Sequence, residues 1–149
     1  MGYRSNVVAL FYTTPIEQVG KTKEENDALN KRNQATLDMF VRENFPKGLS
    51  EPVTDYADGL HRDETDHRVV WKFQFSDVKW YESYPEVQAF DAFWEKFCEL
   101  ADESEEEGDP IFWACEFIRI GENDDDIETK ASNEAEWLMQ VQRSIEFNY

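Results

Sequence analysis

Apolar and polar positions alternate along the chain with two different periods, which separate predicted strands from predicted helices. Residues 6–12 and 111–120 are nearly continuous apolar runs, as is typical of central strands buried on both faces. Alternation over residues 68–75 predicts a strand with one buried face. The parity then changes at Ser76-Asp77, which predicts either a bulge or a turn into a further short strand. Period-two alternation over residues 137–147 predicts a half-exposed strand.

Two segments show apolar residues at the three- and four-residue spacing of amphipathic helices. One spans about residues 22–44 and opens with Thr22-Lys23-Glu24-Glu25, which has the spacing of a capping box. The other spans residues 84–101 and has the clearest apolar stripe in the chain: Val87, Phe90, Trp94, Phe97 and Ala101. Between the first helix and the next strand, residues 46–65 predict an irregular connection.

These elements follow one another in the order β-α-β-α-β-β, which predicts an α+β fold. We expect a single sheet of four or five mostly antiparallel strands with two helices on one face, in a ferredoxin-like arrangement. The chain has 149 residues, the usual size of one domain, and no repeat or linker divides it. Residues 1–149 are therefore expected to form a single acidic α+β domain with a core rich in aromatic side chains.

Negative charge is concentrated in the last two thirds of the chain. The net charge is −18, yet residues 1–50 carry six acidic and seven basic residues. Residues 51–100 carry twelve acidic against five basic residues, and residues 101–149 carry fifteen against three. Such a chain repels nucleic acid and anionic membranes, because phosphate binding depends on neutralisation by cations. Its expected partner is a basic surface, with no direct contact to nucleic acid or membrane.

Two acidic runs in this region are the candidate partner-binding residues. Both are predicted to be exposed loops, one after the second helix and one after the strand at residues 111–120. The candidates are Asp102, Glu103, Glu105, Glu106, Glu107, Asp109, Glu122, Asp124, Asp125, Asp126 and Glu128. The alternative is that these runs are solvated loops that only keep the protein soluble. The pattern does not determine whether the two runs lie at the same end of the sheet.

No motif for catalysis or cofactor binding occurs in the chain. His61 and His67 lie among carboxylates, but without the spacing of a metalloprotease motif or a cysteine ligand. Residues Asp124 to Glu128 resemble the start of a calcium loop, yet the glycine and the twelfth-position glutamate of such a loop are missing. We therefore expect no enzyme activity, no metal site and no cofactor. Arg119 is expected to face away from the apolar side of its strand, towards solvent and without a role.

The two cysteines, Cys98 and Cys115, each lie within an apolar run. This position favours reduced, buried thiols, and the geometry that a disulfide needs is not readable from sequence. No apolar stretch approaches the roughly 20 residues of a membrane span, and no signal peptide is visible. We expect the protein to reside in the cytoplasm.

Three short blocks of the chain carry a resemblance to other proteins. They are Met1-Gly2-Tyr3-Arg4-Ser5, Asp77-Val78-Lys79-Trp80-Tyr81, and Phe117-Ile118-Arg119-Ile120-Gly121-Glu122 followed by Asp124-Asp125-Asp126-Ile127-Glu128. In these blocks the chain resembles a group of small acidic proteins encoded by tailed phages and prophages. The resemblance implies a phage-encoded accessory protein made in the cytoplasm of a bacterial host. Small acidic phage proteins are often inhibitors of host or defence proteins, and some of them imitate the charge of DNA.

The leading functional hypothesis is a non-catalytic interaction protein. It would inhibit a host or defence protein by binding a basic, nucleic-acid-binding surface, in the manner of a DNA mimic. One alternative is a divalent-metal-dependent enzyme that uses carboxylates of residues 122–128 together with His61 or His67. Another is an accessory subunit of the phage particle or of phage replication, whose contacts would be mainly apolar.

Overall fold

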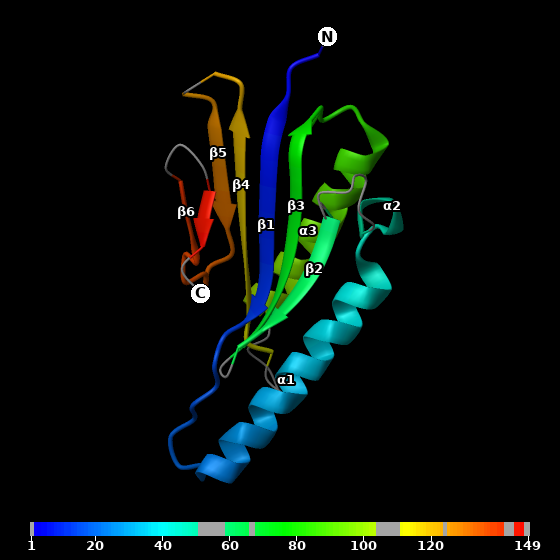
Figure 1. Ribbon diagram of the computed structural model, residues 1–149. Helices are drawn as coiled ribbons and strands as arrows, with labels where there is room; N and C mark the ends of the chain where they lie inside the picture. The colour runs from blue at the N-terminus through cyan, green and yellow to red at the C-terminus, as the bar shows by residue number, and fades with distance from the viewer. Residues whose placement is uncertain are drawn as a thin grey trace.

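The main sheet of the protein has five strands, and the first of them, β1 (Ser5–Thr13), is central (Figure 1). The computed structural model describes residues 2–50, 59–65, 68–103, 111–123, 125–141 and 145–147. After β1 the elements are α1 (Lys23–Asn44), α2 (Lys47–Ser50), β2 (Gly59–Glu64), β3 (Val69–Val78), α3 (Pro85–Glu103), β4 (Trp113–Gly121), β5 (Ile127–Ala131), β6 (Met139–Val141) and β7 (Ile145–Phe147). The strand order is β2-β3-β1-β4-β5, and every neighbouring pair is antiparallel. The expected α+β class is confirmed, with an antiparallel main sheet of five strands.

β1 lies in the middle of the sheet because its side chains are apolar on both faces. Val7, Ala9 and Phe11 belong to the core between the sheet and the helices, whereas Val8 and Leu10 belong to a second core on the opposite face. All five residues are at most 2% exposed. Figure 1 shows α3 behind the sheet, and α1 extends beyond the sheet at its N-terminal end. The second core is completed by the segment that enters β6.

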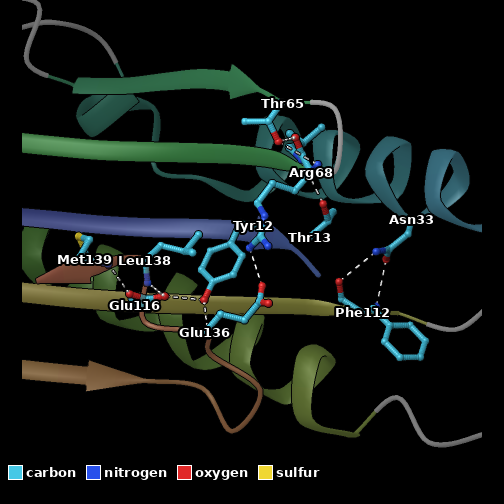
Figure 2. Close-up of polar contacts among 11 residues, drawn as sticks. Tyr12, Thr13, Asn33, Thr65, Arg68, Phe112, Glu116, Glu136, Leu138 and Met139 are labelled. Atoms are coloured by element: carbon cyan, nitrogen blue, oxygen red, sulfur yellow. Dashed lines mark hydrogen bonds and ion pairs between the residues drawn. The ribbon is translucent and has the colours of Figure 1, made fainter. Parts of the chain in front are cut away.

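α1 begins at the capping box that the sequence predicts. Thr22 Oγ1 accepts a hydrogen bond from the Glu25 N–H, and Glu25 Oε1 accepts one from the Thr22 N–H. About three turns after this cap, Asn33 attaches the helix to the chain ahead of β4. Its side-chain amide donates to the Phe112 carbonyl at 3.0 Å and accepts from the Phe112 N–H at 3.1 Å (Figure 2). The helix is therefore positioned by polar contacts as well as by its apolar face.

Aromatic rings fill the space between the sheet and the two long helices. The ring of Phe11 on β1 has five aromatic neighbours at centroid distances of 5.0 to 6.4 Å: Phe45, Phe90, Phe93, Trp94 and Phe97. Four of these neighbours lie on α3, so the apolar stripe of this helix faces the sheet as expected. Each such side chain buries about 150–250 Å², and this burial supplies much of the driving force for packing.

Short polar strands depart from the sequence-based expectation. Within the segment 46–65, which was expected to be irregular, residues 47–50 form α2 and residues 59–64 form β2. Residues 127 and 128, which were expected in an acidic loop, are the first residues of β5. Both β2 and β5 are edge strands of polar composition, which are stabilised by pairing with a neighbouring backbone and carry no apolar alternation of their own. Residues 137–147 are not one strand, because β6 and β7 pair with each other as a separate two-stranded sheet.

The parity change after residue 75 is a bulge, one of the two predicted alternatives. β3 continues to Val78, and its pairing with β1 passes from Phe75 opposite Val7 to Val78 opposite Ser5. β3 thus contributes one residue more than β1 over this stretch. Asp77, within the bulge, has a φ of 57°. This conformation is uncommon for a residue other than glycine, and aspartate is among the side chains that tolerate it best.

Candidate functional site

The structure describes only some of the acidic residues that were expected to bind a partner. Asp102 lies at the C-terminal end of α3, and Glu122, Asp125, Asp126 and Glu128 lie between β4 and β5 or at the start of β5. Glu103 ends α3, and its side chain is not described. The remaining candidates fall outside the described residues: Glu105, Glu106, Glu107, Asp109 and Asp124.

The two acidic runs begin at opposite ends of the sheet. Glu122 directly follows β4, whereas Asp102 lies beside the start of that strand. Asp102 Oδ1 accepts a hydrogen bond from the Asn133 N–H at 3.3 Å, and the neighbouring Ser132 N–H donates to the Cys115 carbonyl at 3.0 Å. β4 has nine residues, so at about 3.4 Å per residue the two ends are roughly 27 Å apart. Most of the described side-chain contacts of the two runs belong to the run after β4.

Arg119 holds this second acidic run against the sheet. Its guanidinium donates to both carboxylate oxygens of Asp126, at 2.9 and 3.1 Å, and to Glu128 Oε1 at 3.1 Å. These contacts with Arg119, and a hydrogen bond from the Tyr3 hydroxyl, hold the pKa of Asp126 below its usual range. The expectation that Arg119 faces solvent without a role is wrong. Arg119 lies two residues beyond Phe117, on the helix-facing side of β4, where both side chains line one groove.

A glycine makes room for the contact between Tyr3 and Asp126. A Cβ atom on Gly121 would lie 2.2 Å from Asp126 Oδ2 and 2.2 Å from the Tyr3 hydroxyl oxygen. These are the two atoms that form the Tyr3–Asp126 hydrogen bond. Any side chain at position 121 would therefore push them apart, which explains why the strand ends on the one residue without a Cβ.

Beside this cluster lies an open groove of about 780 Å³, which we name the acidic groove. It is lined by α3, β4, β5, the start of the chain and the segment that leads into α3. Its aromatic lining residues are Tyr3, Trp80, Tyr81, Trp94 and Phe117. Its carboxylates are Glu82, Asp91, Glu95, Asp126 and Glu128, and its cations are Arg119 and Lys130. Acidic groups therefore outnumber cations around an aromatic surface.

Lys130 occupies part of this groove with its own ammonium group. Lys130 Nζ lies 4.8 Å from the ring centroid of Trp94 and 4.8 Å from that of Phe117. Both distances are within the range of a cation–π interaction. The same nitrogen lies 3.7 Å from Asp91 Oδ1. Burial raises the pKa of Asp91, and Lys130 acts in the opposite direction.

α3 extends the acidic surface from the groove towards the other end of the sheet. Asp91, Glu95 and Asp102 follow one another at intervals of four and seven residues, so they lie along one side of the helix. Glu99, one turn after Glu95, is exposed as well. The carboxylates of α3 thus connect the acidic regions at the two ends of the sheet. The composition of the loops alone does not reveal this connection.

On the opposite face of the sheet, Glu116 is a fully buried carboxylate that the sequence analysis missed (Figure 2). The Tyr12 hydroxyl donates to Glu116 Oε2 at 2.5 Å. The backbone N–H groups of Leu138 and Met139 donate to its two oxygens at 2.8 and 3.1 Å. The Tyr12 hydroxyl in turn accepts a hydrogen bond from the Glu136 N–H at 2.7 Å. Burial, together with the bond to Glu116, raises the pKa of Tyr12.

This Glu116 network is a structural feature, because its polar atoms are already paired. Among the described residues, no buried side-chain nitrogen or oxygen lacks a hydrogen-bond partner. Arg68 covers the network: its guanidinium pairs with Glu136 and lies 5.5 Å from the ring centroid of Tyr12. The sequence does mark Glu116 as the one carboxylate within a predicted central strand. A charge that is buried there needs hydrogen-bond donors from elsewhere in the chain. The network attaches the chain entering β6 to the main sheet.

The histidines of the predicted metal alternative do not come together in the described part of the chain. His61 lies on β2 opposite Lys72 of β3, and His67 falls outside the described residues. Among the residues that the structure describes, no group of three or more His, Cys, Asp or Glu side chains could hold a metal ion. Over the same residues, no helix combines the length and the apolar character needed to cross a membrane.

No protein-family model, curated protein or solved structure matches the chain. The resemblance to small acidic phage proteins therefore stays a prediction.

Proposed function

We propose that the protein is a non-catalytic interaction protein that binds a basic surface of another protein through the acidic groove. The observation that carries this proposal is the position of Lys130. Its ammonium group lies against the rings of Trp94 and Phe117 and beside the carboxylate of Asp91. The groove therefore already stabilises a primary ammonium group, and a lysine or arginine side chain of a partner offers it the same chemistry.

Carboxylates on the rim favour further cations beside Lys130. Glu82 and Glu95 are exposed, and Glu128 remains 49% exposed although Arg119 donates to it. A cation–π contact contributes about 0.5–1 kcal/mol at an exposed site and about 2 kcal/mol when desolvated. An exposed ion pair contributes about 0.2–1 kcal/mol. Micromolar affinity needs about 8 kcal/mol, so the partner must present a basic segment with several cationic side chains.

The spacing of the carboxylates along α3 favours a groove that binds a basic protein segment over a surface that imitates a whole DNA duplex. From Asp91 to Asp102 the helix rises about 16 Å, a length over which duplex DNA carries roughly ten phosphate charges. The described carboxylates over this length are Asp91, Glu95, Glu99 and Asp102. We therefore propose that DNA mimicry is at most partial and that recognition is concentrated at the groove.

The three sequence blocks support the biological setting of this proposal. Tyr3, Trp80 and Phe117 come from the three different blocks, and all of them line the acidic groove. The resemblance to tailed-phage proteins thus coincides with the proposed binding surface. We propose a phage-encoded inhibitor that acts in the cytoplasm of a bacterial host by covering a basic surface of a host or defence protein.

The first experiment measures binding of an arginine-rich peptide labelled with a fluorophore, by fluorescence anisotropy. Lys130→Met removes the ammonium group that occupies the groove, so we expect the peptide to bind about three- to tenfold more tightly. Lys79→Met makes the same change in net charge at an exposed lysine outside the groove lining. An equal gain in both variants would show that general charge, and not the groove, governs binding, and would overturn the proposal.

A second comparison reverses charge inside and outside the groove. Glu95→Lys should weaken peptide binding more strongly than Glu134→Lys, an equal charge change at an exposed residue outside the groove lining. Binding of the unaltered protein should also weaken with added salt, because exposed charges are screened over about 8–10 Å at physiological ionic strength. Parallel affinity capture from bacterial lysate with the unaltered protein and Glu95→Lys then identifies partners that only the unaltered protein retains.

We also propose that the core of the fold is a ferredoxin-like unit. Apart from the four-residue helix α2, the chain order β1-α1-β2-β3-α3-β4 has the β-α-β-β-α-β sequence of elements of that arrangement. In support, α1 and α3 contribute to the same core on one face of an antiparallel sheet. β5 and the β6–β7 ribbon are then additions to this unit. An experimental structure in which the two helices lie on opposite faces would contradict this assignment.

A further inference from the structure

Two cysteines from different elements meet at the edge of the main core. Cys98 lies on α3 and Cys115 on β4, and their sulfur atoms are 3.5 Å apart. Both are free thiols, with Cys98 half-buried and Cys115 buried. A disulfide bond is about 2.05 Å long, so the sulfurs need to approach by roughly 1.5 Å. Side-chain rotation and small helix movements are of this size, and the pair is therefore poised to form a disulfide.

The surroundings of the two sulfurs differ in a way that assigns them separate roles. The hydrogen bond with Cys115 lowers the pKa of Cys98 and Lys130 acts in the same direction, whereas burial and the carboxylates of Asp102 and Glu95 oppose them. Burial raises the pKa of Cys115. Cys98 is also the less buried residue of the pair. A partly exposed thiol of lowered pKa beside a second thiol is the arrangement in which reversible oxidation to a disulfide is favoured.

We propose that Cys98 is an oxidation site for hydroperoxides and that Cys115 resolves the oxidised form to a disulfide between α3 and β4. The Cys98 thiolate attacks one oxygen of hydrogen peroxide, the O–O bond breaks, and hydroxide leaves, so that Cys98 becomes a sulfenic acid. The Cys115 sulfur then attacks the Cys98 sulfur, the S–O bond breaks, and water leaves with the thiol proton. Two electrons pass from the thiol pair to the peroxide.

This inference is independent of the proposed binding function, but the two sites are neighbours. Cys98 follows the groove residue Glu95 by three residues, on the same side of α3 as Asp91 and Asp102. A disulfide at Cys98 would tie the helix that carries the acidic surface to the central part of the sheet. Oxidation is therefore expected to restrict movement of α3 relative to β4 without removing any groove side chain.

The test exposes the folded, reduced protein to dilute hydrogen peroxide and measures its intact mass under non-reducing conditions. We expect the mass to fall by the two thiol hydrogens, and peptide mapping to recover a Cys98–Cys115 cross-linked peptide that disappears on reduction. The urea midpoint of unfolding should rise in the oxidised form, because a disulfide restricts the unfolded chain. Absence of the cross-linked peptide, or cross-links only between separate chains, would overturn the proposal.

Two single variants separate the assigned roles. In Cys115→Ser the sulfenic acid on Cys98 has no resolving thiol, so the sulfenic-acid reagent dimedone should label Cys98 in the folded protein. In Cys98→Ser the remaining buried thiol should stay unlabelled. Labelling of Cys115 with no labelling of Cys98 would show that the assignment is reversed. Far-ultraviolet circular dichroism verifies that both variants are folded. If a variant does not fold, the cross-linked peptide of the unaltered protein still tests the proposal.

Discussion

Replacement of Glu116 by glutamine tests whether one buried carboxylate attaches the C-terminal segment to the sheet. The carboxylate accepts three hydrogen bonds, from the Tyr12 hydroxyl and from the N–H groups of Leu138 and Met139. Glutamine keeps one oxygen, and its amide group meets another donor at the second position. One hydrogen bond is then lost, and the other two are made to a neutral acceptor instead of a charged one. Each of these changes costs about 1–3 kcal/mol, and the total is reduced because glutamine brings no charge into the core.

The expected net loss for Glu116→Gln is about 2–4 kcal/mol in the free energy of unfolding, measured by urea denaturation. Glu116→Leu removes the acceptor entirely, leaves three donors unpaired, and should cost about 3–5 kcal/mol. Glu134→Gln is the matched control, because this residue is exposed, and should change stability by less than about 0.5 kcal/mol.

Two site-specific measurements decide whether the Glu116 network itself causes this loss. Hydrogen exchange at the amides of Leu138 and Met139 should become faster in Glu116→Gln, because these amides donate to the carboxylate. A double-mutant cycle with Tyr12→Phe should show a coupling free energy of at least about 0.5 kcal/mol, as residues in one hydrogen-bond network do. Exchange rates unchanged at both amides, together with strict additivity, would refute the reasoning.

Three further outcomes are expected. Phe97→Ala should lower the free energy of unfolding by about 3–5 kcal/mol in urea denaturation, because it opens a cavity in the core; a cost near zero would contradict the packing of α3. The raised pKa of Tyr12 stabilises the folded protein below the ordinary tyrosine pKa of about 10, and this contribution is lost as pH rises above it. Tyr12→Phe should therefore lose stability less steeply in alkaline solution, and parallel curves would count against the network. Gly121→Ala displaces the Asp126 carboxylate, so carboxyl NMR titration should show the pKa of Asp126 rising towards its usual range, whereas Gly48→Ala meets only open space and should leave it unchanged.

Much of the proposed binding site was not accessible to sequence reasoning. The acidic run after β4 was identified, and Asp126 and Glu128 do line the acidic groove. Lys130 and Arg119 were missed, because a cation within a strand has no local feature that marks it as a contact of aromatic rings or carboxylates. Charge counting predicts the sign of a surface. It does not predict which side chains gather on it.

Glu116 shows the same division within the core. Its position in a strand was predicted, and the run that contains it was expected to be buried. The donors that make this burial tolerable come from residues 12, 138 and 139, which are distant from Glu116 along the chain. A buried charge with unknown partners therefore predicts only that partners must exist.

The sequence by itself determined the elements whose side chains repeat with a local period. These are β1, β3, β4, α1 and α3, together with the central place of β1, because a strand that is apolar on both faces must be covered on both. Tertiary structure alone decided the edge strands, the acidic groove and the cysteine pair. Each of these depends on contacts between distant segments, such as the bond between Tyr3 and Asp126, which are 123 positions apart. Local periodicity carries no information about such contacts, since their free energy exists only after the sheet has brought the segments together.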